Sequence, residues 1–206
     1  LNQESVDLNS YLYAEKVFLA RIAAILGLDG DTSRIEEEAH KLAMMIRQQM
    51  FDPEDGYFYD ISVDGSKRIR VQGPEGWAPL WTGVATASQA SRVIDVMLDS
   101  TRFSTHMPFP TLAADHPEFA PVGGYWRGPV WLDQADFAVR SLEAFERTTE
   151  AQEYRERLIR NASGLLSQAP IYENYVPLTG QGIEAPHFSW SAAHYLMLLA
   201  DYRSED

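Results

Sequence analysis

Apolar side chains recur at three- and four-residue steps in two runs within the first fifty residues, which is the spacing of amphipathic helices. The first run ends at Gly27, a residue that readily takes the left-handed conformation found after helices. In the second run, Ser33 followed by Glu36 has the signature of a capping box. The apolar positions are Leu8, Leu12, Phe18, Leu19, Ile22 and Ile25 in the first run, and Ile35, Ala39, Leu42, Ile46 and Met50 in the second. The pattern predicts two antiparallel helices.

The segment from Tyr57 to Val71 changes to alternation of apolar and polar residues. Asp64 and Gly65 stand in its middle, and this dipeptide supplies the positive φ angles of a tight hairpin turn. The segment therefore predicts a small β-hairpin.

Four further helices are predicted after the hairpin. Thr149 lies at the start of the third of them, and Ser189 is the expected cap of the last. Their ranges are about 83–99, 133–147, 150–168 and 189–202. Six helices and one hairpin place the chain in the all-α class, with the hairpin as an insertion.

Composition and net charge limit the classes of molecule that the chain is expected to bind. The 206 residues are 45% hydrophobic, which is typical of a globular domain with a buried core. A net charge of -13 repels phosphate backbones and anionic lipids, so we expect no nucleic acid, no membrane and a neutral partner. No apolar run approaches the roughly 20 residues of a membrane span. A soluble protein is expected, and the sequence leaves a cytoplasmic or periplasmic location open.

The segments that join the expected helices hold the five tryptophans, at 77, 81, 126, 131 and 190. In order these segments read GPEGWAPLW, GGYWRGPVW, IYENYVPLTGQG and APHFSWSAA. Taken alone, each has a simpler explanation: Trp77 as core, Arg127 as a surface cation, Glu173 as a solvated carboxylate. Together they favour a sugar site, where aromatic rings cover pyranose C–H faces while carboxylates and Arg bind hydroxyls.

The four motifs, in this order, resemble family 63 glycoside hydrolases, which include processing α-glucosidase I and bacterial relatives. The likeness spans about residues 5–200, and Gly76-Trp77-Ala78-Pro79 also has a weaker likeness to trehalases. The resemblance implies an α/α toroid, a double ring of six inner and six outer helices. The six expected helices would form its C-terminal half, so residues 1–206 are expected to be a single but incomplete domain, a processed product or an excerpt of a longer chain.

The resemblance also implies inverting hydrolysis of α-glucosidic bonds, with Glu173 in the position of the general base. Family members carry the general acid in an upstream segment of Gly-Trp-Asp type, and no Trp-Asp pair occurs in this sequence. The acid is therefore expected in the N-terminal half of the same domain. Asp115, Glu118 and Asp133 are weaker internal candidates, because the first two lie near a proline and Asp133 fits a helix N-cap.

The expected sugar-binding residues come from the same four motifs. They are Trp77, Trp81, Trp126, Arg127, Trp131, Tyr175 and Trp190. Arg127 is placed near the reacting sugar, because its planar fork of donors suits hydroxyl groups. Asn174, Tyr175 or the backbone of residues 180–182 could hold the attacking water.

Other chemistries are less consistent with the sequence. The five histidines lack metal-ligand spacing, and the chain has no cysteine, so no metal and no cofactor are expected. A non-catalytic sugar-binding or scaffold module without an acid remains an alternative. Within the enzyme class, trehalase, mannosylglycerate hydrolase and debranching activities also stay open.

Overall fold

The computed structural model describes residues 2–203, with side chains to Ala200, and divides the chain into two compact units. The first unit contains Leu1–Arg70 and Glu75–Val93, and the second contains Val71–Pro74 and Ile94–Asp206. Helices dominate both units, and the strands are short. No helix in the described part of the chain is long and apolar enough to cross a lipid bilayer.

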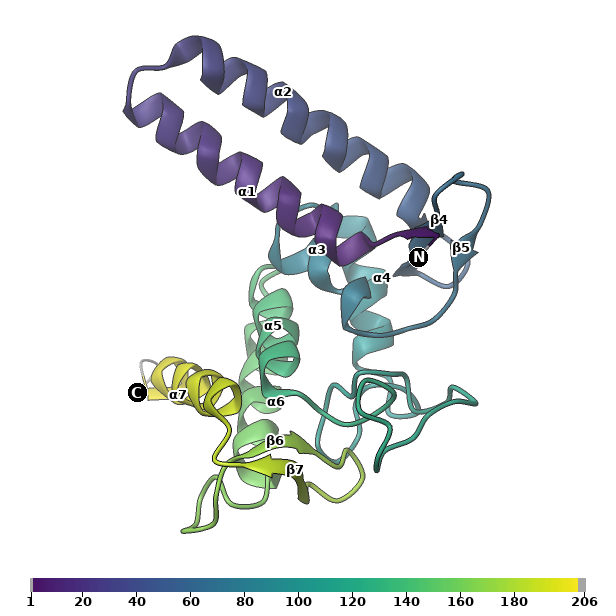
Figure 1. Ribbon diagram of the computed structural model, residues 1–206, viewed down its shortest axis with the longest axis vertical. Coiled ribbons are helices and arrows are strands. Elements are labelled where there is room, and N and C mark those ends of the chain that lie inside the picture. Colours follow the sequence, from purple (N-terminus) through teal and green to yellow (C-terminus); the bar gives the residue numbers. More distant parts are fainter. Residues whose placement is uncertain (1, 204–206) are drawn as a thin grey trace. The chain divides into compact units, whose positions relative to one another are not determined.

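Helices α1 (Val6–Ile25) and α2 (Asp29–Met45) of the first unit run side by side (Figure 1). Their buried contact uses small side chains, among them Ala20, Ala23, Ala39 and Ala43. The second helix begins a turn earlier than its capping-box signature predicts, because Leu28 is its N-cap and makes no side-chain bond. A π-helical segment, Ile46–Met50, continues α2.

The apolar stripe predicted for α1 is not the face that the structure buries. The buried residues of α1 are Val6, Ser10, Ala20 and Ala23. The predicted stripe is exposed, and consists of Leu8, Leu12, Phe18, Leu19, Ile22 and Ile25. Helix α1 packs on α2 through alanines, which leaves the larger side chains on the outside.

The predicted hairpin is present as β4 (Asp60–Ser62) and β5 (Arg68–Ile69). Strand β1 (Gln3–Glu4) pairs with the free edge of β4, giving the strand order β1-β4-β5. A second pair, β2 (Phe51–Asp52) with β3 (Tyr57–Phe58), lies between α2 and this sheet in sequence.

The segment after the hairpin forms a 3₁₀ turn, Pro74–Gly76, and two helices, α3 (Ala78–Trp81) and α4 (Ala87–Met97). Helix α4 begins four residues later than predicted, because Gly83 takes a φ of 81° and interrupts the helix there. Trp81 therefore lies in a short helix rather than in a connecting segment.

Helices α5 (Leu132–Glu143), α6 (Thr148–Asn161) and α7 (Ser189–Arg203) form the helical part of the second unit. Helix α5 packs against both α6 and α7. It ends earlier than predicted, because the turn into α6 begins at Ala144. Helix α6 is also shorter, because turns replace the helix after Asn161.

The sequence did not predict the hairpin formed by β6 (Tyr172–Tyr175) and β7 (Gly182–Pro186). It lies beside the start of α7 (Figure 1). An isolated bridge joins Tyr175 to Val130, just before α5. Glu173 is thus on a strand, and the expectation of a loop position was wrong.

Candidate active site

Glu173 stands at the centre of the candidate site in the second unit. Its carboxylate is partly exposed, and the hydroxyl of Tyr125 donates to its Oε1 over 3.4 Å. The hydroxyl of Ser191, at the start of α7, donates to the backbone oxygen of Glu173 over 3.0 Å. The strand is therefore held to α7 while its carboxylate stays accessible to water.

An aromatic cluster surrounds the tyrosine that binds Glu173. Trp126 and Trp131 are stacked, with ring centroids 4.4 Å apart and an angle of 9° between planes. Tyr125 meets Trp131 edge-on at 5.2 Å, and Trp190 lies 6.3 Å from Trp131. Trp126 and Trp190 are 44% and 58% exposed, so rings of this size are available to the apolar face of a sugar.

The loop that carries Tyr125 is conformationally constrained. Tyr125 has a φ of 58°, in the left-handed region that non-glycine residues seldom adopt. A side chain at Gly124 would lie 2.1 Å from the backbone oxygen of Ala120, so this position requires glycine. The indole of Trp131 donates to the backbone oxygen of Tyr125 over 3.2 Å. These contacts fix Tyr125 toward the strand.

The electrostatics of the site keep Tyr125 a hydrogen-bond donor. Desolvation, and then the negative charge of Glu173 and its hydrogen bond, raise the pKa of the Tyr125 hydroxyl above its ordinary value. The charge of Glu184 on β7 acts in the same direction. Tyr125 therefore stays protonated at neutral pH and can donate to the Glu173 carboxylate.

Arg127 and Tyr175 occupy different surroundings from the aromatic cluster. The Arg127 guanidinium is exposed and lies 3.2 Å from Glu118. Tyr175 is fully buried, its hydroxyl accepts from the backbone N–H of Tyr172, and burial raises its pKa. Its ring supports the hairpin from within. Direct sugar contacts by these two residues stay predictions.

Trp77 and Trp81 belong to the first unit. Trp77 is buried at the N-cap of α3, and Trp81, the last residue of α3, lies 5.6 Å from Tyr11. Their predicted contact with sugar stays a prediction.

The backbone donors proposed to hold water are largely engaged elsewhere. The N–H of Gly180 donates to Val176, and that of Gly182 donates to the hydroxyl of Ser163. Asn174 is buried, and its side-chain amide has no hydrogen-bond partner among the described residues.

The internal acid candidates also have partners. Asp115 lies 3.2 Å from Arg102, Glu118 pairs with Arg127, and Asp133 accepts from Gln134. Asp133 is the second residue of α5, so the expected N-cap role was wrong, and Trp131 is the N-cap.

A buried ionic cluster connects the helices that carry two of the tryptophans. Asp136 on α5 is 1% exposed, and its Oδ2 lies 3.0 Å from both Arg140 and His194 of α7. Trp131 caps α5 and Trp190 stands in the first turn of α7, so the cluster fixes their relative position. Sequence reasoning missed this pairing because no local pattern links positions 58 residues apart.

Sequence reasoning also missed Tyr125 and Phe188. Both stand inside the aromatic motifs, beside Trp126 and near Trp190. Phe188 lies 5.6 Å from Trp190, within the same cluster. Their position within those motifs was the available signal.

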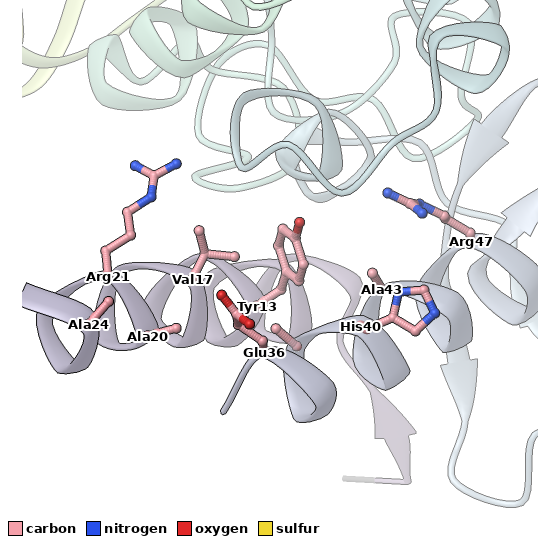
Figure 2. Close-up of a pocket in the computed structure, with 10 residues that line it drawn as sticks. Tyr13, Val17, Ala20, Arg21, Ala24, Glu36, His40, Ala43 and Arg47 are labelled. Carbon is pink, nitrogen blue, oxygen red and sulfur yellow. The ribbon is translucent and has the colours of Figure 1, made fainter. Parts of the chain in front are cut away.

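A separate groove of about 360 Å³ lies between α1 and α2 in the first unit (Figure 2). Small residues such as Ala20 and Ala43 line it, with Tyr13, Glu36 and His40 among the polar side chains. The groove contains no residue predicted for the site.

A family model described as the mannosylglycerate hydrolase MGH1-like glycoside hydrolase domain matches residues 1–191. The chain belongs to this glycoside hydrolase family. A mannosylglycerate hydrolase of Rubrobacter radiotolerans is 30% identical over 194 residues, covering 92% of this chain and 42% of that protein.

Solved structures confirm the fold. The family 63 mannosylglycerate hydrolase of Thermus thermophilus, in complex with Tris and D-glycerate, has a TM-score of 0.80 at 27% identity. The match covers 96% of this chain and 46% of that one. Neutral trehalase of Saccharomyces cerevisiae has a TM-score of 0.81 at 19% identity, with 97% and 38% coverage, which shows the fold alone.

The glycoside hydrolase domain therefore folds as part of an α/α toroid, as predicted, and corresponds to the C-terminal half of the family 63 fold. The chain spans about half the length of the relatives it matches.

Proposed function

We propose that this chain forms the base-bearing half of an inverting glycoside hydrolase that acts on α-glucosidic bonds, with Glu173 as general base. The supporting observation is the placement of the Glu173 carboxylate. It is partly open to water, accepts a hydrogen bond from Tyr125, and stands next to the exposed tryptophan cluster.

The mechanism needs two carboxyl groups on opposite sides of the anomeric carbon, roughly 6.5 to 9.5 Å apart. Glu173 removes a proton from a water that attacks this carbon. A protonated carboxyl group donates to the departing glycosidic oxygen. Tyr125 orients the base, and Trp126 and Trp190 hold the sugar ring through their exposed faces.

The proposal assigns the acid to the other half of the catalytic domain, outside this chain. Relatives are about twice as long as the matched region, which leaves room for that half. The exposed apolar stripe of α1 defined above supports this partner. Ile25 is 84% exposed and Leu8 is 66% exposed, and a soluble domain seldom leaves such a stripe uncovered. The N-terminal half is the occupant that we propose for it.

Glu173→Gln tests the role of the base in the complete domain, this chain joined to its N-terminal half. We expect turnover of an activated α-glucoside to fall by at least ~10²-fold, because an amide cannot accept the proton of the water. Sugar binding should persist, since the amide keeps the shape of the side chain.

Two controls accompany this substitution. Glu153→Gln, on α6, removes the same charge at an exposed position and should leave turnover unchanged. The 206 residues without the other half should hydrolyse nothing measurable. Near-normal turnover of the Glu173→Gln variant would remove this residue from the role, and full activity of the isolated chain would place the acid within it.

Hydrolysis of mannosylglycerate is a second candidate. It is favoured by the names of relatives that are 29% to 30% identical to this chain. The same base and the same exposed aromatic rings would serve it, so the two candidates differ in the sugar and in the charge of the leaving group.

A further inference from the structure

The strand that carries Glu173 is tied both to α7 and to the segment that leads into α5. The hydroxyl of Ser191 on α7 donates to the backbone oxygen of Glu173 over 3.0 Å. Two residues further along β6, Tyr175 exchanges backbone hydrogen bonds of 2.8 and 3.0 Å with Val130. Val130 directly precedes the N-cap of α5. The position of the Glu173 backbone therefore depends on how α5 and α7 lie against each other.

A buried side-chain pair joins α5 directly to α7. Nδ1 of His194 lies 3.0 Å from Oδ2 of Asp136, and Nε of Arg140 donates to the same oxygen over 3.0 Å. Asp136 is 1% exposed, so water does not compete for this oxygen. The ring of Phe137 meets the His194 ring edge-on at 5.6 Å. A carboxylate oxygen only accepts hydrogen bonds, so Nδ1 is the donor and the imidazole is held in one orientation.

These contacts close a circuit that begins and ends at Glu173. Ser191 and His194 are three residues apart on α7, so they lie on the same side of the helix, one turn apart. Asp136 and the bridge residue Val130 are likewise connected through the first turns of α5. In order, the members of the circuit are Glu173, Ser191, His194, Asp136, Val130 and Tyr175. The strand cannot shift without lengthening one of these bonds.

The circuit holds the part of Glu173 that decides where its carboxylate lies. The hydrogen bond from Tyr125 to the carboxylate is long, at 3.4 Å, whereas the backbone bond from Ser191 is 3.0 Å. A base must hold its water in line with the anomeric carbon, and a misplacement of about 1 Å can cost about 10²-fold in rate. Buried ionic groups are often no more stabilising than apolar side chains of the same volume. Stability alone therefore does not account for Asp136 and His194.

We propose that Asp136 and His194 are positioning residues that act on Glu173 through Ser191. The inference rests on the proposed function, because it takes Glu173 as the base. The bond between Asp136 and His194 fixes the place of α7 against α5, and Ser191, one turn earlier, transmits that position to the backbone of Glu173. Without this bond α7 still packs against α5, but the base takes up a wider range of positions. The chemical step then slows, while sugar binding is retained.

Two substitutions of His194 in the complete domain separate its hydrogen bond from its bulk. In His194→Leu the side chain still packs against Phe137 but has no donor, and Asp136 keeps Arg140 as a partner. In His194→Asn an amide N–H stands near the place of Nδ1, so the bond to Asp136 can form again.

Glu143→Leu is the matched control. Glu143 on α5 forms an ion pair with the buried Arg155 of α6, and this pair lies outside the circuit. The substitution therefore removes a contact between helices of the same unit without touching the strand of Glu173. It should lower the temperature of thermal unfolding and leave kcat unchanged.

Steady-state kinetics are measured with mannosylglycerate and with an activated α-glucoside. For the substrate that the domain hydrolyses, we expect kcat to fall about tenfold in His194→Leu and KM to change less than about twofold. His194→Asn should keep most of the original kcat. A merely structural role predicts instead that His194→Leu, at temperatures where it is folded, has an unchanged kcat, and this result would overturn the inference.

Ser191→Ala, alone and combined with His194→Leu, tests the route of the effect. Ser191→Ala removes the last link to Glu173 and should lower kcat by a similar factor. Because both substitutions open the same circuit, the double variant should be no slower than the slower single variant. Losses that multiply in the double variant would show that His194 does not act through Ser191, and would overturn the proposed route.

Amide hydrogen exchange gives a readout that does not depend on turnover. The N–H groups of Val130 and Tyr175 bond to each other's carbonyl oxygens, and opening of the circuit should release them. We expect their exchange to be about tenfold faster in His194→Leu and unchanged in His194→Asn and Glu143→Leu. A domain that hydrolyses neither substrate would count against the proposed function. The exchange would then decide the inference, and unchanged exchange in His194→Leu would overturn it.

Discussion

The hairpins β4–β5 and β6–β7 differ in what holds them together. The turn of β4–β5 is closed by its own residues: the hydroxyl of Ser62 and the backbone N–H of Ser66 both donate to Asp64. These bonds lower the pKa of Asp64 to about 2, so its carboxylate remains an acceptor at neutral pH. Gly65 supplies the positive φ of the turn. The turn of this hairpin is therefore specified locally, while β1 pairs with the outer edge of β4.

The hairpin β6–β7 depends on contacts from distant parts of the second unit. Val130 pairs with Tyr175 through two backbone hydrogen bonds of 2.8 and 3.0 Å. The hydroxyl of Ser191 binds the backbone of Glu173. Its connecting segment is longer, and its pairing register shifts between Tyr172 and Asn174. The comparison teaches that the candidate catalytic strand is positioned by the surrounding fold, which allows it an irregular backbone.

Tyr175→Ala should remove packing that holds the hairpin β6–β7 in place, and it should have the largest effect on stability of the substitutions predicted here. Tyr175 is fully buried, and truncation of a buried aromatic ring costs about 3 to 5 kcal/mol. We expect the free energy of unfolding to fall by this amount and glycosidase turnover to fall as well. Denaturant unfolding and steady-state kinetics on the complete domain would measure both.

Tyr175→Phe is the matched control, because it keeps the ring and removes only the hydroxyl that accepts from Tyr172. Loss of this hydrogen bond should cost about 1 kcal/mol. If Tyr175→Ala left turnover intact, the dependence of the site on this support would be contradicted.

Gly65→Ala should weaken the first hairpin with a smaller effect. A Cβ at this position meets no atom within 4 Å, so the φ of 68° is the source of the cost. We expect a loss of about 1 kcal/mol in unfolding free energy and unchanged turnover. Thermal unfolding and the same kinetic assay would check this, and a substantial loss of turnover would show that the two hairpins are not independent in function.

The sequence predicted those elements whose determinants are local. The two helices at the start, the tight turn at Asp64 and Gly65, and the helical class all follow from periodicity or turn chemistry. The segment from Ile171 to Pro186 has no regular alternation, and its hairpin is specified by Val130 and Ser191, which no local pattern reveals. The hairpin was therefore missed.

In the candidate site, too, the features carried by local motifs were predicted and those set by the surrounding fold were not. The motifs led to Glu173 and to the cluster of Trp126, Trp131 and Trp190, because the resemblance is carried by those segments. The partner of the base is Tyr125, and its backbone conformation with positive φ is not indicated by the sequence. The exposed stripe of α1 shows another limit of the sequence, because periodicity identifies an apolar face but not which face packs within this chain.

The stereochemistry of the first product tests the central claim most directly. Proton NMR can follow hydrolysis of an α-glucoside by the complete domain before mutarotation mixes the anomers. A water activated by Glu173 attacks the face opposite the leaving group, so β-glucose should appear first. Initial release of α-glucose would contradict the inverting mechanism and the role of Glu173 as a general base acting through water.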